Sequence, residues 1–155
     1  MRAVVEWGGR LDGLVNNAST FYPTPVGEIT EAEWTDLIGS NLKAPLFLSQ
    51  AAAPLLRDSH GVIINLVDIH SQRPLRNHPV YGPAKAGLAM LTRALAKDLA
   101  PQVRVNGVSP GAILCLTFFS LSLFSSPKPT PFMATTTSPG FRPIGSPLSG
   151  LILMR

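Results

Sequence analysis

The chain of 155 residues has a single cysteine, no long apolar segment at its start and few charged side chains. Cys115 alone excludes an internal disulfide and favours a reducing compartment, so we expect a cytoplasmic protein. Residues 1–7 lack the apolar core of a signal peptide, and the apolar stretch 114–124 is too short to span a bilayer. We therefore expect no association with a membrane.

Acidic residues are absent after Asp98, so the two ends of the chain differ in composition. Residues 115–155 are crowded with Ser, Thr and Pro and contain only three charged residues, all basic, which predicts a disordered low-complexity tail. The rest of the chain is nearly neutral despite the overall charge of +4, so no nucleic-acid surface is expected. With 45% hydrophobic residues the chain has enough apolar side chains for one packed domain, expected over residues 1–114.

The hydrophobic pattern predicts an α/β fold. Short apolar runs rich in β-branched residues are typical of buried parallel strands, and apolar residues repeating at three and four positions are typical of helices. The expected strands are residues 11–16, 61–67 and 103–109, and the expected helices run from Thr30 toward Pro54 and from Val80 to Pro101. This alternation implies right-handed crossovers and a parallel sheet.

Tyr81 and Lys85 stand four residues apart at the start of the second helix and therefore share one helix face. A tyrosine has a pKa of about 10, but a neighbouring ammonium favours the phenolate and makes proton transfer accessible. Asp68 follows the strand 61–67, at the edge where open α/β sheets bind ligands. The pattern indicates a proton-transfer site, although a Tyr and Lys taken alone are more often a surface pair, and Asp68 alone a solvated loop acid.

Polar and aromatic residues follow the strand 11–16. Asn16-Asn17-Ala18-Ser19 either lets a ligand approach the backbone or forms an ordinary polar turn. Phe21 and Tyr22 lie in a proline-containing loop, where they either stack on a flat ligand ring or cap the core. Asn41 falls on the apolar face of the first helix, and a buried amide needs partners, so it either bonds backbone or holds a water near the site.

Together these segments resemble the short-chain dehydrogenase/reductase family over residues 1–114. The resemblance rests on Asn-Asn-Ala-Ser at 16–19, Asn41, the Tyr81/Lys85 pair and Arg-Val-Asn-Gly-Val-Ser-Pro-Gly at 104–111, in this order. Within the family, Asn-Ala-Ser-Thr-Phe-Tyr-Pro-Thr-Pro at 17–25 and the acid at 68 resemble the pteridine reductases, since most relatives have Ser at that place. An ionised carboxylate only accepts hydrogen bonds, which suits the N–H-rich edge of a pterin better than a ketone.

The resemblance implies a doubly wound, Rossmann-like parallel sheet in a three-layer α/β/α arrangement. It also implies an oxidoreductase that transfers a hydride from NADPH to a pterin-like small molecule, without a metal. Tyr81 and Asp68 would handle protons, and Lys85 would bond the nicotinamide ribose and tune Tyr81. Asn41 would hold a relay water, and Phe21 would stack on the pterin. The cofactor would be lined by Asn17, Ala18, Ser19, Tyr81, Lys85, Pro110 and Gly111.

The sequence departs from this family pattern at the cofactor phosphates. The chain contains no Gly-rich strand and turn of the kind that takes the pyrophosphate, so we expect a partial domain with one bare sheet edge. Two alternatives stay open: a short-chain dehydrogenase acting on carbonyl substrates, and a non-catalytic fragment acting as a subunit-interface partner. In this family the helices around 31–53 and 79–100 commonly form subunit interfaces, so the resemblance also allows a homo-oligomer.

Overall fold

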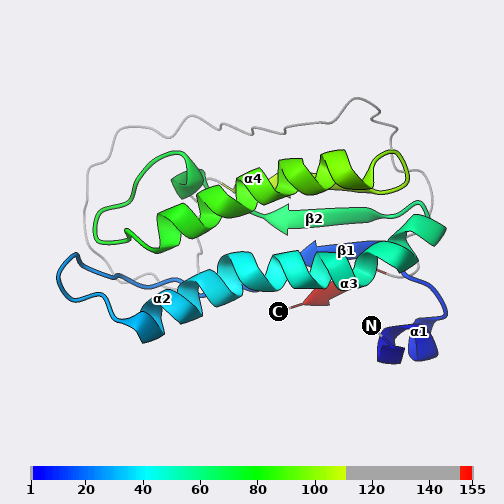
Figure 1. Cartoon of the computed structure of the whole chain (residues 1–155), viewed down its shortest axis with the longest axis horizontal. Helices are drawn as coiled ribbons and strands as arrows, with labels where there is room; N and C mark the ends of the chain where they lie inside the picture. Colours follow the sequence, from blue (N-terminus) through cyan, green and yellow to red (C-terminus); the bar gives the residue numbers. More distant parts are fainter. Residues whose placement is uncertain (1, 111–150, 155) are drawn as a thin grey trace, which may run out of the picture.

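A four-stranded parallel sheet with strand order β3-β2-β1-β4 forms the centre of the protein (Figure 1). The computed structural model describes residues 2–110 and 151–154. In chain order the elements are α1 (Arg2–Gly8), β1 (Gly13–Asn16), α2 (Glu31–Ile38), the π-helical η1 (Gly39–Lys43), α3 (Ala44–Asp58), β2 (Val62–Leu66), the 3₁₀-helical η2 (Ile69–Ser71), α4 (Tyr81–Leu99), β3 (Arg104–Val108) and β4 (Leu151–Met154). The predicted α/β fold is confirmed, because β1, β2 and β3 are neighbouring parallel strands joined by helices.

The helices α3 and α4 lie side by side and cover one face of the sheet (Figure 1). Leu14 of β1 and Ile63 of β2 are register partners and are buried beneath this layer. Leu56 from α3 and Leu99 from α4 belong to the same buried cluster. Burying one such side chain contributes about 1.5–3 kcal/mol, so this cluster is a main source of stability for the sheet and its helical layer.

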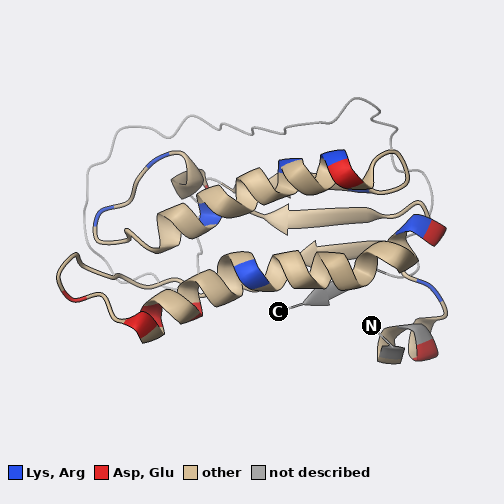
Figure 2. Cartoon of the chain, viewed as in Figure 1, with Lys and Arg blue, Asp and Glu red and all other residues tan. Residues whose placement is uncertain are grey.

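The start of α2 is the capping box that the sequence predicts. The backbone N–H of Glu33 donates to Thr30 Oγ1 at 3.2 Å, and the backbone N–H of Thr30 donates to Glu33 Oε2 at 2.8 Å. Figure 2 shows acidic residues, in red, at this end of α2, and the first turn contains Glu31 and Glu33. Negative charge is favourable there because the helix N-terminus carries a partial positive charge.

The helix that begins at Glu31 differs from the prediction in two ways. It continues past Pro54 to Asp58, and its middle contains the π-helical turn η1. Pro54 is exposed, so the carbonyl of Gln50, which loses its helical donor, lies on the exposed side where water can bind it. Ala53 and Leu56 beside it are buried against the sheet, and their packing keeps the chain helical beyond the proline.

The edge of β1 that we expected to be bare carries β4. Gly13 pairs with Leu151 and Asn16 with Met154, in parallel register. Residues 115–150 lie outside the described residues, so the expected disorder of the low-complexity tail stays a prediction, with Leu151–Met154 described as β4. A row of unpaired strand N–H and C=O groups invites pairing, and the apolar segment Leu151–Met154 pairs with it. In the ranges that the structure covers, no helix has the length and hydropathy needed to cross a bilayer.

Candidate active site

The predicted site residues gather at the carboxyl end of the sheet. Figure 1 shows that β1 and β2 point toward the same end of the molecule, where α4 begins. Asp68 follows β2, Ser19 follows β1, and Tyr81 is the first residue of α4. The connection from β2 through η2 returns the chain so that Tyr81 faces Asp68, which places these residues in contact despite their separation in sequence.

Tyr81 and Asp68 form the central contact of the site. The Tyr81 hydroxyl donates to Asp68 Oδ2 at 2.7 Å, while Asp68 Oδ1 accepts the backbone N–H of His70 at 2.9 Å and so caps η2. Tyr81 is buried. Burial, the hydrogen bond to Asp68 and the charge of Asp68 raise the pKa of Tyr81, and the nearby Ser19 hydroxyl lowers it by a smaller amount. Tyr81 is therefore held as a protonated donor near neutral pH.

Lys85 lies one helical turn after Tyr81 and is buried. Its Nζ donates to the carbonyl of Leu66, at the end of β2, at 3.0 Å and lies 5.7 Å from the centre of the Tyr81 ring. Burial lowers the pKa of Lys85, and the charge of Asp68 raises it by less. The pKa of Tyr81 is raised by its burial and by Asp68, so the tuning of Tyr81 by Lys85 stays a prediction.

Asn41 lies in η1 and is fully buried. Its side-chain nitrogen donates to the carbonyls of Thr20 at 2.9 Å and Leu37 at 3.0 Å, and Ser19 Oγ donates to Asn41 Oδ1 at 2.6 Å. Of the two readings left open by the sequence, bonding to backbone is the one observed. Asn41 therefore fixes the loop after β1 to the helix, and it does so from a π-turn, a feature often found at functional sites.

A chain of buried polar residues lies behind the site. Asn16 and Asn65 are register partners on β1 and β2, and Asn16 Nδ2 donates to Asn65 Oδ1 at 2.7 Å. Asn65 Nδ2 donates to Thr92 Oγ1 at 2.9 Å, which in turn donates to the carbonyl of Leu88. Sequence reasoning missed Asn65 and Thr92, although an amide within an apolar strand is itself a signal that a buried partner exists.

Phe21 and Tyr22 differ in their surroundings. Tyr22 packs against the buried cluster that contains Leu37 and Tyr81, as the core-capping alternative requires. Phe21 is 56% exposed, its ring stacks on the His78 ring at 4.7 Å between centroids, and it meets the Tyr81 ring edge-on at 4.8 Å. Phe21 is thus a partly open aromatic surface beside the Tyr81 hydroxyl.

The expected cofactor-lining residues that the structure describes lie at the same sheet edge. Asn17, Ala18 and Ser19 are exposed directly after β1, and Pro110 is half-buried after β3. Gly111 lies outside the described residues. Small exposed side chains at this edge fit a ring and ribose that approach the backbone closely. These residues fit the nicotinamide half of a dinucleotide.

The comparisons define the class of protein. The family model described as enoyl-(acyl carrier protein) reductase matches residues 1–125, and the chain belongs to the short-chain dehydrogenase/reductase family. Members of this family are oxidoreductases that use nicotinamide cofactors.

Three relatives show how far the likeness extends. Pteridine reductase 1 of Leishmania tarentolae is 43% identical, over 69% of this chain and 44% of the relative. L-xylulose reductase of Bos taurus is 38% identical, over 68% of this chain and 45% of the relative. The structure of an apo SCOR enzyme from Clostridium thermocellum superposes with a TM-score of 0.70 and 31% identity, over 80% of this chain and 49% of that one. The chain thus spans about half the length of these relatives.

Proposed function

We propose that the chain carries the proton-transfer site of a cytoplasmic, NADPH-dependent reductase that acts on a pterin-like small molecule. The observation that carries the proposal is the 2.7 Å hydrogen bond between the Tyr81 hydroxyl and Asp68, with the Phe21 ring edge-on to Tyr81. A buried proton donor, a carboxylate acceptor and a partly exposed aromatic ring match the N–H-rich edge and the flat face of a pterin. The likeness to pteridine reductase 1 supports the same choice.

The proposed reaction adds a hydride and a proton across a C=N bond of a dihydropterin. NADPH, when bound, supplies the hydride and both electrons. Tyr81 gives its hydroxyl proton to the ring nitrogen, and its raised pKa keeps that proton in place until the transfer. Asp68 accepts hydrogen bonds from the N–H groups of the pterin and orients both the substrate and the Tyr81 hydroxyl. Water returns the proton to the Tyr81 phenolate.

The remaining residues would position this chemistry. Lys85 would bond the nicotinamide ribose, and its burial beside Leu66 O limits its movement. Asn41 would hold the relay water through Oδ1, which Ser19 already bonds. Asn17, Ala18, Ser19, Pro110 and Gly111 would line the cofactor.

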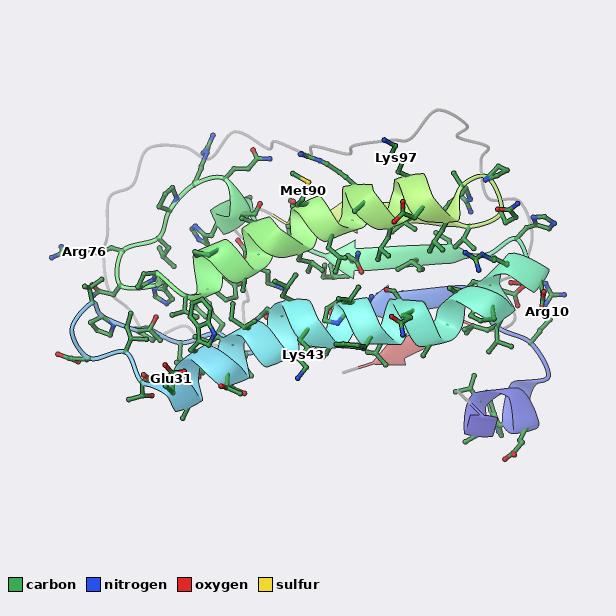
Figure 3. All side chains as sticks on the ribbon, in the orientation of Figure 1. Arg10, Glu31, Lys43, Arg76, Met90 and Lys97 are labelled. Carbon is green, nitrogen blue, oxygen red and sulfur yellow. The ribbon has the colours of Figure 1, made fainter. Side chains whose placement is uncertain are left out.

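The outer faces of the helices support a homo-oligomer as part of this proposal. Trp34 of α2 is 48% exposed, Phe47 of α3 52% and Met90 of α4 61%. Figure 3 shows Met90 projecting outward from α4. Large apolar side chains of this kind are common in subunit interfaces. The same surface favours the non-catalytic alternative, in which the chain acts only as a subunit-interface partner.

The test is substrate choice with and without the Asp68 carboxylate. The chain, joined to a Gly-rich strand and turn of the family, is assayed with NADPH and either dihydropterin or a simple ketone, and Asp68→Ser is compared with Asp58→Ser, which changes an exposed acid at the end of α3. We expect dihydropterin to be preferred, and Asp68→Ser to lose about 10²-fold or more of that rate while Asp58→Ser does not. A ketone preference, or an equal pterin rate in Asp68→Ser, would refute the pterin assignment. Binding without any turnover would favour the non-catalytic alternative.

A further inference from the structure

His78 lies in the loop before α4 and has no part in the proton transfer described above. Its ring is stacked on the Phe21 ring and nearly parallel to it, at an interplanar angle of 14° and a centroid distance of 4.7 Å. Tyr81 meets Phe21 at 73°. His78 therefore stacks on one face of Phe21 and Tyr81 makes an edge-to-face contact with it, whereas more than half of the residue remains exposed.

The His78 ring is itself fixed in orientation. Its Nδ1 lies 2.8 Å from the carbonyl oxygen of Arg76, and a carbonyl can only accept, so Nδ1 carries the proton. Nε2 is buried and has no hydrogen-bond partner within residues 2–110 and 151–154, so ring packing holds that end of the imidazole. Figure 3 shows the Arg76 side chain directed outward from the loop.

A backbone contact joins the same two loops next to the rings. The N–H of Thr24 donates to the carbonyl of Asn77 at 2.7 Å. Asn77 has a φ of 61°, a left-handed conformation that asparagine tolerates better than most residues. The loop that bears Phe21 is thus attached to the loop before α4 at two adjacent points, one backbone and one aromatic.

We infer that His78 is a positioning residue, which holds Phe21 so that the exposed part of its ring can receive a flat heteroaromatic ring beside Tyr81. The identity of that ring as a pterin rests on the proposed function, whereas the positioning of Phe21 does not. Without the imidazole, Phe21 keeps only its edge contact with Tyr81, and a ligand must order the ring when it binds. Ordering a side chain on binding costs enough to weaken affinity by about 2- to 12-fold.

Two substitutions test the contribution of the His78 ring and that of its hydrogen bond separately. His78→Asn keeps an N–H donor near the position of Nδ1 and removes the ring, whereas His78→Phe keeps a ring and removes the donor. His70→Asn is the matched control, because His70 Nδ1 makes the same type of contact, 2.9 Å to the carbonyl of Arg73, without an aromatic neighbour. Circular dichroism and urea unfolding establish that each variant is folded.

The first measurement needs no ligand. The chain is labelled with ¹³C-phenylalanine, and the Phe21 ring signals are assigned by their loss in Phe21→Leu. Ring currents from His78 and Tyr81 should displace these signals in the wild type. The displacement should shrink in His78→Asn, persist in His78→Phe and be unchanged in His70→Asn. Unchanged Phe21 signals in a folded His78→Asn chain would overturn the inference.

The second measurement is pterin affinity, by quenching of pterin fluorescence. We expect the Kd to rise about 2- to 12-fold in His78→Asn and to stay within twofold of wild type in His78→Phe and His70→Asn. Equal affinity in wild type and His78→Asn would overturn the inference while leaving the pterin assignment intact. The converse outcome is also informative. If the Phe21 signals respond to the His78 substitutions as expected but the wild-type chain does not bind pterin, positioning by His78 is supported and the proposed substrate is refuted.

Discussion

Replacing Tyr81 with phenylalanine should destabilise the chain near neutral pH and progressively less above pH 10. At pH 8 the substitution removes a 2.7 Å hydrogen bond to the Asp68 carboxylate. Such bonds contribute about 1.5–3 kcal/mol, and because Asp68 is only half-buried and can be rehydrated, the lower figure applies, about 1.5 kcal/mol. The free energy of unfolding should therefore fall by that amount.

The stability difference between wild type and Tyr81→Phe shrinks as pH rises, because the pKa of Tyr81 is higher in the folded chain than in the unfolded one. Below about pH 10 both states are protonated and the stabilisation is complete. Above it the unfolded chain loses this proton and the folded chain keeps it, so stability falls by at most about 1.4 kcal/mol per pH unit. Wild type and Tyr81→Phe should therefore become equally stable about one unit higher, near pH 11.

Urea unfolding at intervals from pH 8 to 11.5 measures this difference without the screening that guanidinium, a salt, would add. Lys85 has a lowered pKa and contributes the opposite slope, but it is present in both proteins and cancels. Tyr22→Phe is the control, since Tyr22 donates to Asp36 at 3.0 Å from a more solvated position and should give a shallower trend. A Tyr81→Phe difference that stays constant across this range would refute the coupling between Tyr81 and Asp68.

Two further predictions concern the strand entry and the cofactor. Gly61→Ala should lower the free energy of unfolding by about 1–3 kcal/mol, measured by urea unfolding, because an added Cβ would lie 2.6 Å from the Asp12 carbonyl oxygen and 2.7 Å from Leu56 Cδ2. NADPH should bind this chain with a Kd well above micromolar, since the sequence has no Gly-rich turn for the pyrophosphate and each charge-assisted hydrogen bond contributes about 1.5–3 kcal/mol. Micromolar affinity in a fluorescence titration would contradict this prediction.

The sequence predicted the elements that depend on local pattern and missed the features that depend on distant contacts. The parallel pairing of β1, β2 and β3 and the position of Asp68 after β2 follow from periodicity and from the rules for parallel sheets, and the start of the first long helix at Thr30 follows from its capping residues. The raised pKa of Tyr81 did not follow, because it depends on burial and on the carboxylate that reaches its hydroxyl. The contact of His78 with Phe21 was not predicted either, because it joins two loops in which apolar residues do not repeat at helix or strand spacing.

The end of the first long helix shows why boundaries were less certain. Pro54 is an ordinary stop signal, yet buried Ala53 and Leu56 stabilise the helix beyond it. The residue types at 151–154 allow a strand, but nothing local indicates that β1 is the partner. In each case tertiary packing outweighs local preference.

The π-turn at Gly39–Lys43 has a consequence for anyone who redesigns this chain. The N–H of Ala44 bonds the carbonyl of Gly39, so this turn encloses one residue more than an α-helical turn. Deleting one residue here would remove the bulge and give a regular helix that propensity scales favour, but it would change the direction of the side chains within the turn, Asn41 among them. The amide of Asn41 would then no longer face Thr20 and Ser19. A regular helix at this place would therefore lose the contacts that attach the loop after β1. In a sequence alignment this change would be visible only as a single gap.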